Sequence, residues 1–191
     1  TASQAFIPPG GYGKKILRRK KGGGMSINEC REIYREAFGS DGEFENRLFT
    51  CCFKYCRTLS IGGKTASMLF ALPCNIHNAA APVPAYYIFA AATKKEFRGN
   101  GYMSRLIRSL EADRLLFLKP ASPSLFGFYE RLGFQPFSVS SNENSPCFAE
   151  PAEGFAALAD EEEKAPISCT ALFKYDRNIL IDGLFFPYFM E

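Results

Sequence analysis

The stretch YYIFAAATKKEFRGNGYMS, from Tyr86 to Ser104, decides the fold that we predict for this chain. Residues 85–93 form an apolar run without charges, which predicts a strand buried on both faces of a sheet. From Asn100 onward, apolar residues recur at the i, i+3, i+4, i+7 spacing of a helix. Because Gly99 and Gly101 lie where this helix starts, the segment is predicted to be a strand, a short loop and a helix N-terminus.

Such a helix start favours an anionic ligand. A helix N-terminus leaves four backbone N–H groups unpaired and carries about half a positive charge. Glycines at 99 and 101 leave room for a diphosphate to approach those amides, and Arg98 adds a cation. A ligand that carries a diphosphate is therefore expected.

Two familiar glycine motifs do not fit. The pattern G-x-G-x-x-G fails because Ser104 stands at the position of its third glycine. Gly63-Lys64-Thr65 resembles the end of a Walker A loop, but Thr58 stands where its first glycine belongs. The sequence therefore argues against a nucleotide hydrolase.

Further elements are predicted on both sides of this segment. Ser26 and Glu29 form a capping-box pattern that opens a helix over 27–38, with Ile33, Ala37 and Cys30 on its buried face. The remaining predictions are a first strand at 14–21, a second helix from Phe44 to near Arg57, a hairpin of 58–61 and 64–70 around Gly62-Gly63, a loop bracketed by Pro73, Pro82 and Pro84, a strand at 114–119, a helix at 124–132 capped by Gly133, a strand at 134–140, a loop at 142–164, and strands at 167–175 and 179–189.

Two motifs at matching distance give the chain a family resemblance. Residues 98–103 (RGNGYM) resemble the acetyl-CoA loop Gln/Arg-x-x-Gly-x-Gly/Ala of the Gcn5-related N-acetyltransferase (GNAT) family, with Met103 in place of the usual small residue. The run Gly-Tyr-Met-Ser is similar to that of an uncharacterised bacterial-type branch. Downstream, Tyr129 to Phe134 resembles the family segment Tyr-x-x-x-Gly-Phe, whereas Ser122 replaces a common asparagine.

The resemblance implies an acyl-CoA N-acyltransferase fold, an α+β (three-layer α/β) arrangement of a mixed, mostly antiparallel sheet flanked by helices. It implies one domain over 1–191, with its acetyl-CoA core at about 85–134. Acetyl-CoA, the acyl donor, would lie between the strand ending at Thr93 and the strand ending near Lys119, and add to the exposed edge. The residues expected to bind it are Ala91, Thr93, Arg98, Gly99, Asn100, Gly101, Tyr102, Met103 and Ser104.

The resemblance also assigns Tyr129 as the catalytic general acid beside the sulfur, because a phenol stays protonated at neutral pH. The alternative is that its hydroxyl only orders the pantetheine arm. No general base is assigned: Glu43, Glu45, Glu96 and Glu191 are conceivable, but each is read first as a surface acid. The lone histidine, His77, is expected in a structural or surface role.

The composition argues against several other classes of protein. No apolar run is long enough to span a bilayer, so no membrane association is expected. Seven cysteines, an odd number without C-x-x-C pairs or histidines at ligand spacing, predict reduced thiols, a cytoplasmic protein and no metal. Six basic residues in the first 28 could contact nucleic acid, but a solvated strand is favoured and a nucleic-acid partner is unlikely.

These observations lead to one functional prediction and one alternative. The prediction is an acyl-CoA-dependent N-acyltransferase that moves acetyl from acetyl-CoA to a primary amine, by direct attack in a ternary complex. The acceptor is a small-molecule or peptide amine, for which Tyr86, Tyr87, Phe185, Phe186, Tyr188 and Phe189 could line a pocket. The alternative is a non-catalytic acyl-CoA-binding or sensing module on the same fold. A homodimer is compatible with the sequence.

Overall fold

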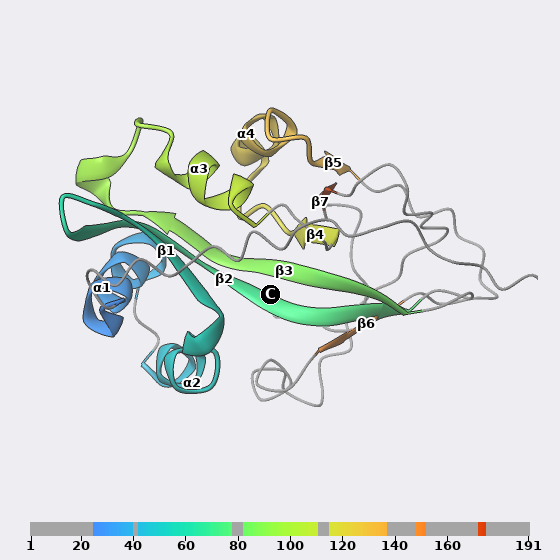
Figure 1. The fold of residues 1–191 in the computed structure, drawn as a ribbon, viewed down its shortest axis with the longest axis horizontal. Coiled ribbons are helices and arrows are strands. Elements are labelled where there is room, and N and C mark those ends of the chain that lie inside the picture. The colour runs from blue at the N-terminus through green and yellow to red at the C-terminus, as the bar shows by residue number, and fades with distance from the viewer. Residues whose placement is uncertain are drawn as a thin grey trace, which may run out of the picture.

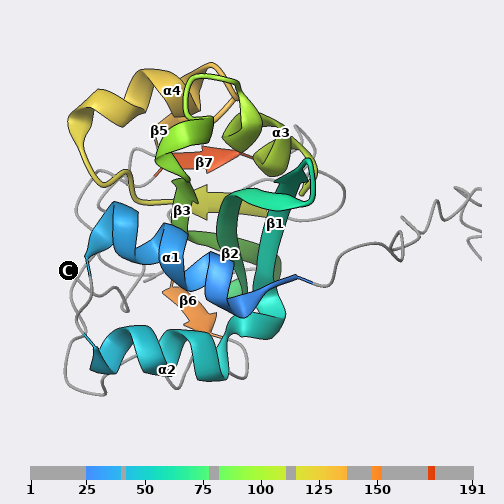
Figure 2. The same cartoon turned by 90° about the vertical axis from the view of Figure 1, so that its left-hand side faces the viewer.

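The computed structural model describes residues 25–39, 42–77, 82–110, 115–136, 148–151 and 172–174, in which helices cover both faces of one sheet (Figures 1 and 2). The elements, with η for a 3₁₀ turn, are α1 (Ile27–Phe38), α2 (Glu43–Cys51), η1 (Phe53–Tyr55), β1 (Cys56–Ile61), β2 (Lys64–His77), β3 (Pro82–Thr93), η2 (Lys95–Phe97), α3 (Tyr102–Arg108), β4 (Leu115–Leu118), η3 (Pro123–Leu125), α4 (Phe126–Glu130), β5 (Gln135–Pro136), β6 (Phe148–Pro151) and β7 (Leu172–Lys174).

The sheet is mixed and mostly antiparallel, as predicted. Its strand order is β1-β2-β3-β4-β7-β5, and β6 pairs with β2. Strands β3 and β4 run parallel, whereas the other described pairings are antiparallel. Helices α1 and α2 lie on one face and α3 and α4 on the other (Figure 2). This arrangement is the three-layer acyl-CoA N-acyltransferase fold expected from the sequence.

Each face of the sheet has its own apolar core. Alternate residues of a strand point to opposite faces, so Phe70 packs with α1 and α2 while its neighbour Leu69 packs with α3 and α4. On the α1 side the core is built around Phe49 and Phe117, and on the α3 side Ile107 is completely buried. The strands in the middle of the sheet are therefore apolar on both faces.

Helix α1 begins where predicted, but its buried face differs. The Ser26 hydroxyl accepts a hydrogen bond from the Glu29 N–H at 3.4 Å. The Glu29 carboxylate, rather than closing the capping box, accepts hydrogen bonds from the Thr65 N–H and hydroxyl of β2. Cys30 and Ile33 are buried as predicted, whereas Ala37 is exposed and Tyr34 is buried in the core. The prediction of the buried face is therefore wrong at Ala37 only.

The second helix is shorter than predicted. It ends at Cys51, and Phe53 lies in the 3₁₀ turn η1 instead of on the helix. Strand β1 begins at Cys56, whereas Cys52 lies between α2 and η1. Both thiols are nevertheless buried in the α1-side core. The apolar spacing could not distinguish a helix from a tight turn followed by a strand.

The Gly62-Gly63 hairpin is confirmed, with positive φ values of 57° and 81°. The predicted loop around the prolines is wrong, because β2 continues to His77 and β3 begins at Pro82. Pro73 lies between the part of β2 paired with β1, which ends at Phe70, and the part paired with β6, which begins at Cys74. One edge of β2 has no described partner there, so a missing N–H is tolerated.

The later elements follow the prediction with two differences. Helix α3, strand β4 and helix α4 with its Gly133 cap are all present. The segment 142–164, predicted as a loop, contributes strand β6, and the described part of the predicted 134–140 strand is only β5. The 14–21 strand, the 179–189 strand and the acidic end Glu191 lie outside the described residues. In the described parts of the chain, no helix has the length and apolarity that a bilayer crossing requires.

Candidate functional site

Among the described strands, β3 has an unpaired edge in the middle of the sheet. Its parallel pairing with β4 runs only from Ala85 to Tyr87, opposite Leu115 to Phe117. Strand β3 then continues to Thr93, and on this side no described strand pairs with it beyond Tyr87. We call residues 88–93 the open edge of β3. Backbone groups along it are available to a ligand that adds as a further strand.

A β-bulge changes the direction of the backbone groups within the open edge. The pairing of β2 with β3 shifts between Met68 and Phe70, and Ala90 has a positive φ of 48°, a conformation rare for residues other than glycine. Phe89 and Ala90 consequently pack on the same face of the sheet, and Ala91 packs on the opposite one. A bulge of this kind leaves a residue out of the ladder and turns its backbone groups to a new direction.

The end of β3 shows where one carbonyl points. The Lys94 N–H donates to Ala66 O of β2 at 2.9 Å. Since the C=O and N–H of a trans peptide point in opposite directions, Thr93 O is directed to the open edge. Arg98 Nε donates to it at 3.0 Å. The Thr93 hydroxyl pairs with Ser67 Oγ at 2.8 Å. Thr93 therefore presents its backbone, but not its side chain, to the open edge.

The glycines of the following loop are explained by its conformation. Gly99 and Gly101 have φ values of 79° and 70°, and a Cβ at either would meet nothing within 4 Å. The backbone angle alone thus requires glycine, whether or not a ligand approaches. The Asn100 amide donates to Phe97 O at 3.2 Å and to Arg98 O at 3.1 Å, which closes the loop on itself. Asn100 consequently holds the turn that presents the start of α3.

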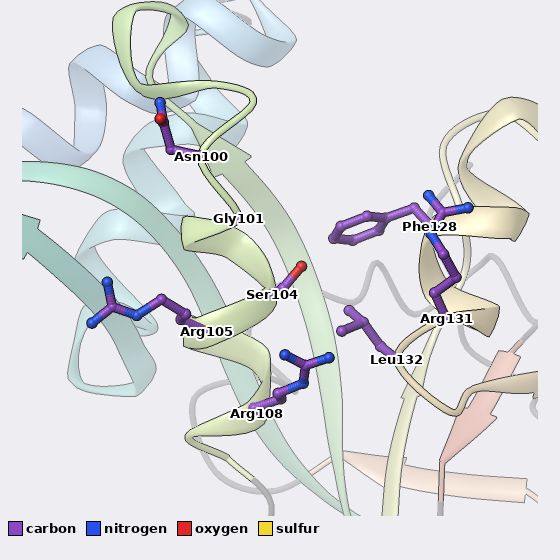
Figure 3. A pocket seen from close by; sticks show the side chains of 8 residues that line it. All are labelled: Asn100, Gly101, Ser104, Arg105, Arg108, Phe128, Arg131 and Leu132. Carbon is purple, nitrogen blue, oxygen red and sulfur yellow. The ribbon is translucent and has the colours of Figure 1, made fainter.

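A pocket of about 660 Å³ opens at the start of α3 (Figure 3). Ser104 and Arg108 of α3 face Phe128 and Leu132 across it, whereas the Arg105 side chain turns away from α4 (Figure 3). The lining residues are Asn100, Gly101, Ser104, Arg105, Arg108, Phe128, Arg131 and Leu132. Among the described residues, the lining includes three arginines and no acidic residue. The pocket is therefore suited to an anion.

The structure distributes the predicted binding residues over several places. Asn100, Gly101 and Ser104 line the pocket, whereas Tyr102 packs edge-on against Phe97 at 6.2 Å and Met103 packs on the α3-side core. The pocket arginines Arg105, Arg108 and Arg131 were not predicted. For Arg105 and Arg108, the sequence signal that could have indicated them is their i, i+3 spacing on the polar face of α3. Arg131 is the C-cap of α4, which only the fold brings close to α3.

Tyr129 is held in the core by the end of α4. Gly133, at φ 87°, ends the helix, and the Phe134 N–H donates to Tyr129 O at 3.1 Å while the Gly133 N–H donates to Glu130 O at 2.9 Å. These two bonds form a Schellman motif. The Phe134 ring packs against the Tyr129 ring at 5.7 Å. The Gly-Phe pair of the segment thus fixes the tyrosine.

Burial determines the ionisation of Tyr129. The side chain is 8% exposed, and burial raises the pKa of its phenol above the ordinary value. Tyr129 does not line the arginine pocket, although its neighbour Phe128 does. Ser122, which precedes this helix, pairs its hydroxyl with Ser124 at 2.7 Å. The phenol is therefore protonated at neutral pH and separate from the anion pocket.

The conceivable bases lie in different surroundings. Glu45 is 1% exposed and not a surface acid: its carboxylate binds Arg31 at 2.7 Å and Arg35 at 2.8 Å. Glu43 is exposed, and Glu96 is exposed beside Lys94 at 3.6 Å. None of these three lines the pocket.

The two described aromatics of the predicted acceptor pocket lie on different faces of the sheet. Tyr86 packs with the α3-side core and Tyr87 with the α1-side core. Tyr87 stacks on Phe117 at 5.1 Å, and burial raises the pKa of its phenol. These two side chains cannot line one wall together, and the other four predicted aromatics lie outside the described residues.

Comparison with known proteins identifies the family. Residues 25–137 match the family model of the GNAT acetyltransferase domain. The chain belongs to the GNAT acetyltransferase family. The match includes the open edge of β3, the glycine loop, the pocket and Tyr129. No curated protein matches this chain.

Several solved structures are similar to this GNAT chain. A conserved protein of unknown function from Enterococcus faecalis V583, described as a probable N-acyltransferase, is 21% identical with a TM-score of 0.51, over 58% of this chain and 30% of its own. A GCN5-related N-acetyltransferase from Anabaena variabilis ATCC 29413 is 24% identical with a TM-score of 0.49, over 58% and 29%. Glucosamine-6-phosphate N-acetyltransferase from Arabidopsis thaliana is 17% identical with a TM-score of 0.43, over 62% and 92%. The chain thus matches less than a third of the first two proteins.

Proposed function

We propose that this GNAT chain is an N-acyltransferase that transfers acetyl from acetyl-CoA to a primary amine by direct attack in a ternary complex. One observation carries the proposal: an open strand edge leads from the middle of the sheet to an arginine-lined pocket at the start of α3. A long ligand with amides along its length and phosphates at one end matches this order of sites. Coenzyme A has that composition.

The residues present fit such a carrier. The amides of a pantetheine arm would pair with the backbone of residues 88–93, as an added strand does. Ala91 and Ala92 have small side chains beside that path, and Thr93 O points toward it. The diphosphate would lie at the pocket, with Arg108 and Arg131 as the cations and Ser104 as a hydroxyl donor. Acetyl-CoA would supply the activated acyl group as a thioester.

Tyr129 has the properties of a proton donor to the departing sulfur. When a neutral amine attacks the thioester carbonyl, a C–N bond forms, the C–S bond breaks and the sulfur leaves with an electron pair. The Tyr129 O–H would give its proton to that thiolate and regain one from solvent afterwards, while the amine nitrogen loses a proton to solvent or to a base. Because burial raises its pKa, Tyr129 keeps this proton across the neutral range.

Thiol release with a panel of amines tests the transfer reaction. We expect acetyl-CoA-dependent release of free thiol with at least one primary amine, and a rise of the melting temperature with coenzyme A itself. Stabilisation by coenzyme A without thiol release from any amine would instead indicate a non-catalytic binding module.

Substitution of Tyr129 tests its role. Tyr129→Phe keeps the ring that packs on Phe134 and removes only the hydroxyl, so the fold and the carrier Kd should stay close to wild type. We expect kcat to fall by about 100-fold, the lower range for loss of a general acid. Full turnover in this variant at every pH would contradict the assignment.

A further inference from the structure

The loop between β3 and α3 is fastened to α1 through one carboxylate. The Lys95 N–H donates to Glu36 Oε1, and the Arg98 guanidinium lies 3.4 Å from the same oxygen. Glu36 belongs to α1, about sixty residues earlier in the chain. The same guanidinium donates through Nε to Thr93 O. The Arg98 side chain thus connects the end of the open edge and the loop to α1.

From this geometry we propose that Glu36 and Arg98 are positioning residues, a clasp that holds the loop 95–101 in the conformation that binds the carrier. This inference rests on the proposed function for the identity of the carrier. In this proposal Arg98 acts on the loop and not as a phosphate ligand, because two of its donors, Nε and Nη2, are directed to Thr93 and Glu36. The clasp instead fixes the turn from which Gly101 and Ser104 reach the pocket.

Stability alone does not account for the clasp. The side chains of Arg98 and Glu36 are 52% and 33% exposed, and ion pairs so exposed stabilise a folded protein little. The carboxylate nevertheless accepts from a backbone N–H of the loop in addition to the guanidinium, which constrains the loop at two points. Fixing a loop in its binding conformation lowers the ordering cost of binding. The clasp therefore affects ligand affinity more than folding.

The clasp and a direct phosphate contact predict opposite effects of one substitution. Glu36→Ala removes a negative charge and releases the Arg98 guanidinium. If Arg98 bound phosphate directly, this change would strengthen or preserve the binding of coenzyme A. If the clasp positions the loop, the same change weakens binding, because the loop must be ordered when the ligand arrives.

The test combines calorimetry with coenzyme A and hydrogen exchange of the unligated chain. We expect Glu36→Ala to raise the Kd about 10-fold, with kcat changed less than about 2-fold and the melting temperature lowered by less than about 3 °C. Glu36→Gln, which keeps an acceptor oxygen for the Lys95 N–H, should recover part of the affinity. Arg98→Lys should behave like Glu36→Ala, because it keeps the charge and loses the Nε donor. Glu32→Ala, an exposed carboxylate on the same helix, is the matched control and should bind like wild type.

Hydrogen exchange separates the clasp from the proposed function. Amides of residues 95–101 should exchange faster in unligated Glu36→Ala than in wild type or Glu32→Ala. Unchanged exchange, or an unchanged or lower Kd in Glu36→Ala, overturns the clasp. If wild type binds no coenzyme A while the exchange difference is present, the proposed function fails and the clasp stands as a device that orders this loop.

Discussion

Gly133 ends the helix that carries Tyr129 and so contributes to its position. Its φ of 87° lies in the left-handed region, where a Cβ is unfavourable, and a Cβ there would also touch the Lys174 side chain at 3.5 Å. Gly127, the second residue of the same helix, has an ordinary φ, and its Cβ would meet only Arg131 at 3.6 Å. The two glycines therefore form a matched pair.

We expect opposite effects from alanine at these two positions. Gly133→Ala should lower the free energy of unfolding by about 1 kcal/mol, the cost of a left-handed residue with a Cβ. Gly127→Ala should raise it by about 0.5–1 kcal/mol, the helix preference for alanine. Urea unfolding measures both. A Gly133→Ala variant as stable as wild type would contradict the role given to the helix end.

Buried phenols make this chain sensitive to alkaline pH. Burial raises the pKa of Tyr87 and of Tyr129, so the folded chain keeps these protons at a pH where the unfolded chain has released them. Their contribution to stability is fully present below the unfolded pKa of about 10 and is lost as the pH rises through the folded pKa. Urea unfolding from pH 8 to 11 should show this decline, and it should be shallower in Tyr129→Phe. Parallel curves for the two proteins would exclude Tyr129 as a cause.

For single residues, the sequence predicted backbone conformations better than side-chain contacts. The positive φ of Gly62, Gly63 and Gly133 followed from local patterns, because a turn or helix end requires glycine there. The partners of Arg98 and Glu45 did not, because both are bound by side chains or carbonyls that the fold brings together. Local sequence carries no information on such pairs.

Between elements, Glu45 joins α2 to α1. Its carboxylate is almost completely buried and binds two arginines of α1, of which Arg31 is 20% and Arg35 53% exposed. Arg31 also lies over the Phe49 ring at 4.7 Å. Because both arginines keep contact with solvent, water compensates part of their positive charge when the carboxylate is removed.

Removal of this carboxylate should affect folding and not ligand binding. Glu45→Ala should lower the free energy of unfolding by about 2 kcal/mol, less than the cost of breaking a fully buried pair, because both arginines stay partly exposed. Glu43→Ala, an exposed carboxylate in the first turn of the same helix, should change it by less than about 0.5 kcal/mol. Chemical denaturation at neutral pH gives both values. Equal stabilities of the two variants would show that the buried pair contributes nothing.

The elements themselves were predictable where local patterns decide them. The order of β3, loop and α3 followed from an uncharged run, two glycines and a helical apolar stripe. The path of β2 through Pro73 did not, because its tolerance depends on where β1 ends and β6 begins. The second helix was extended too far because Phe53 continues the apolar spacing inside a turn.

At the scale of the whole molecule, the site is formed by segments that meet only in the fold. Strand β3 supplies the open edge, α3 supplies Ser104 and Arg108, and α4 with its C-cap supplies Tyr129 and Arg131. The sequence motifs indicated the loop and the tyrosine, but the arginines that make the pocket cationic became evident only when α3 and α4 were placed side by side (Figure 3). The motifs therefore predicted an anion-binding helix start, but not the three arginines of the pocket.

The proposal that the pocket at the start of α3 binds coenzyme A is tested most directly by calorimetry. Coenzyme A is titrated into the wild-type chain and into the double variant Arg108→Gln/Arg131→Gln. We predict saturable binding by wild type and a Kd at least about 10-fold higher in the double variant, since each guanidinium–phosphate contact is a charge-assisted hydrogen bond. Lys54→Gln, which removes an exposed cation of η1, is the control and should bind like wild type. No binding of coenzyme A by well-folded wild type, or equal affinity in the double variant, would contradict the account.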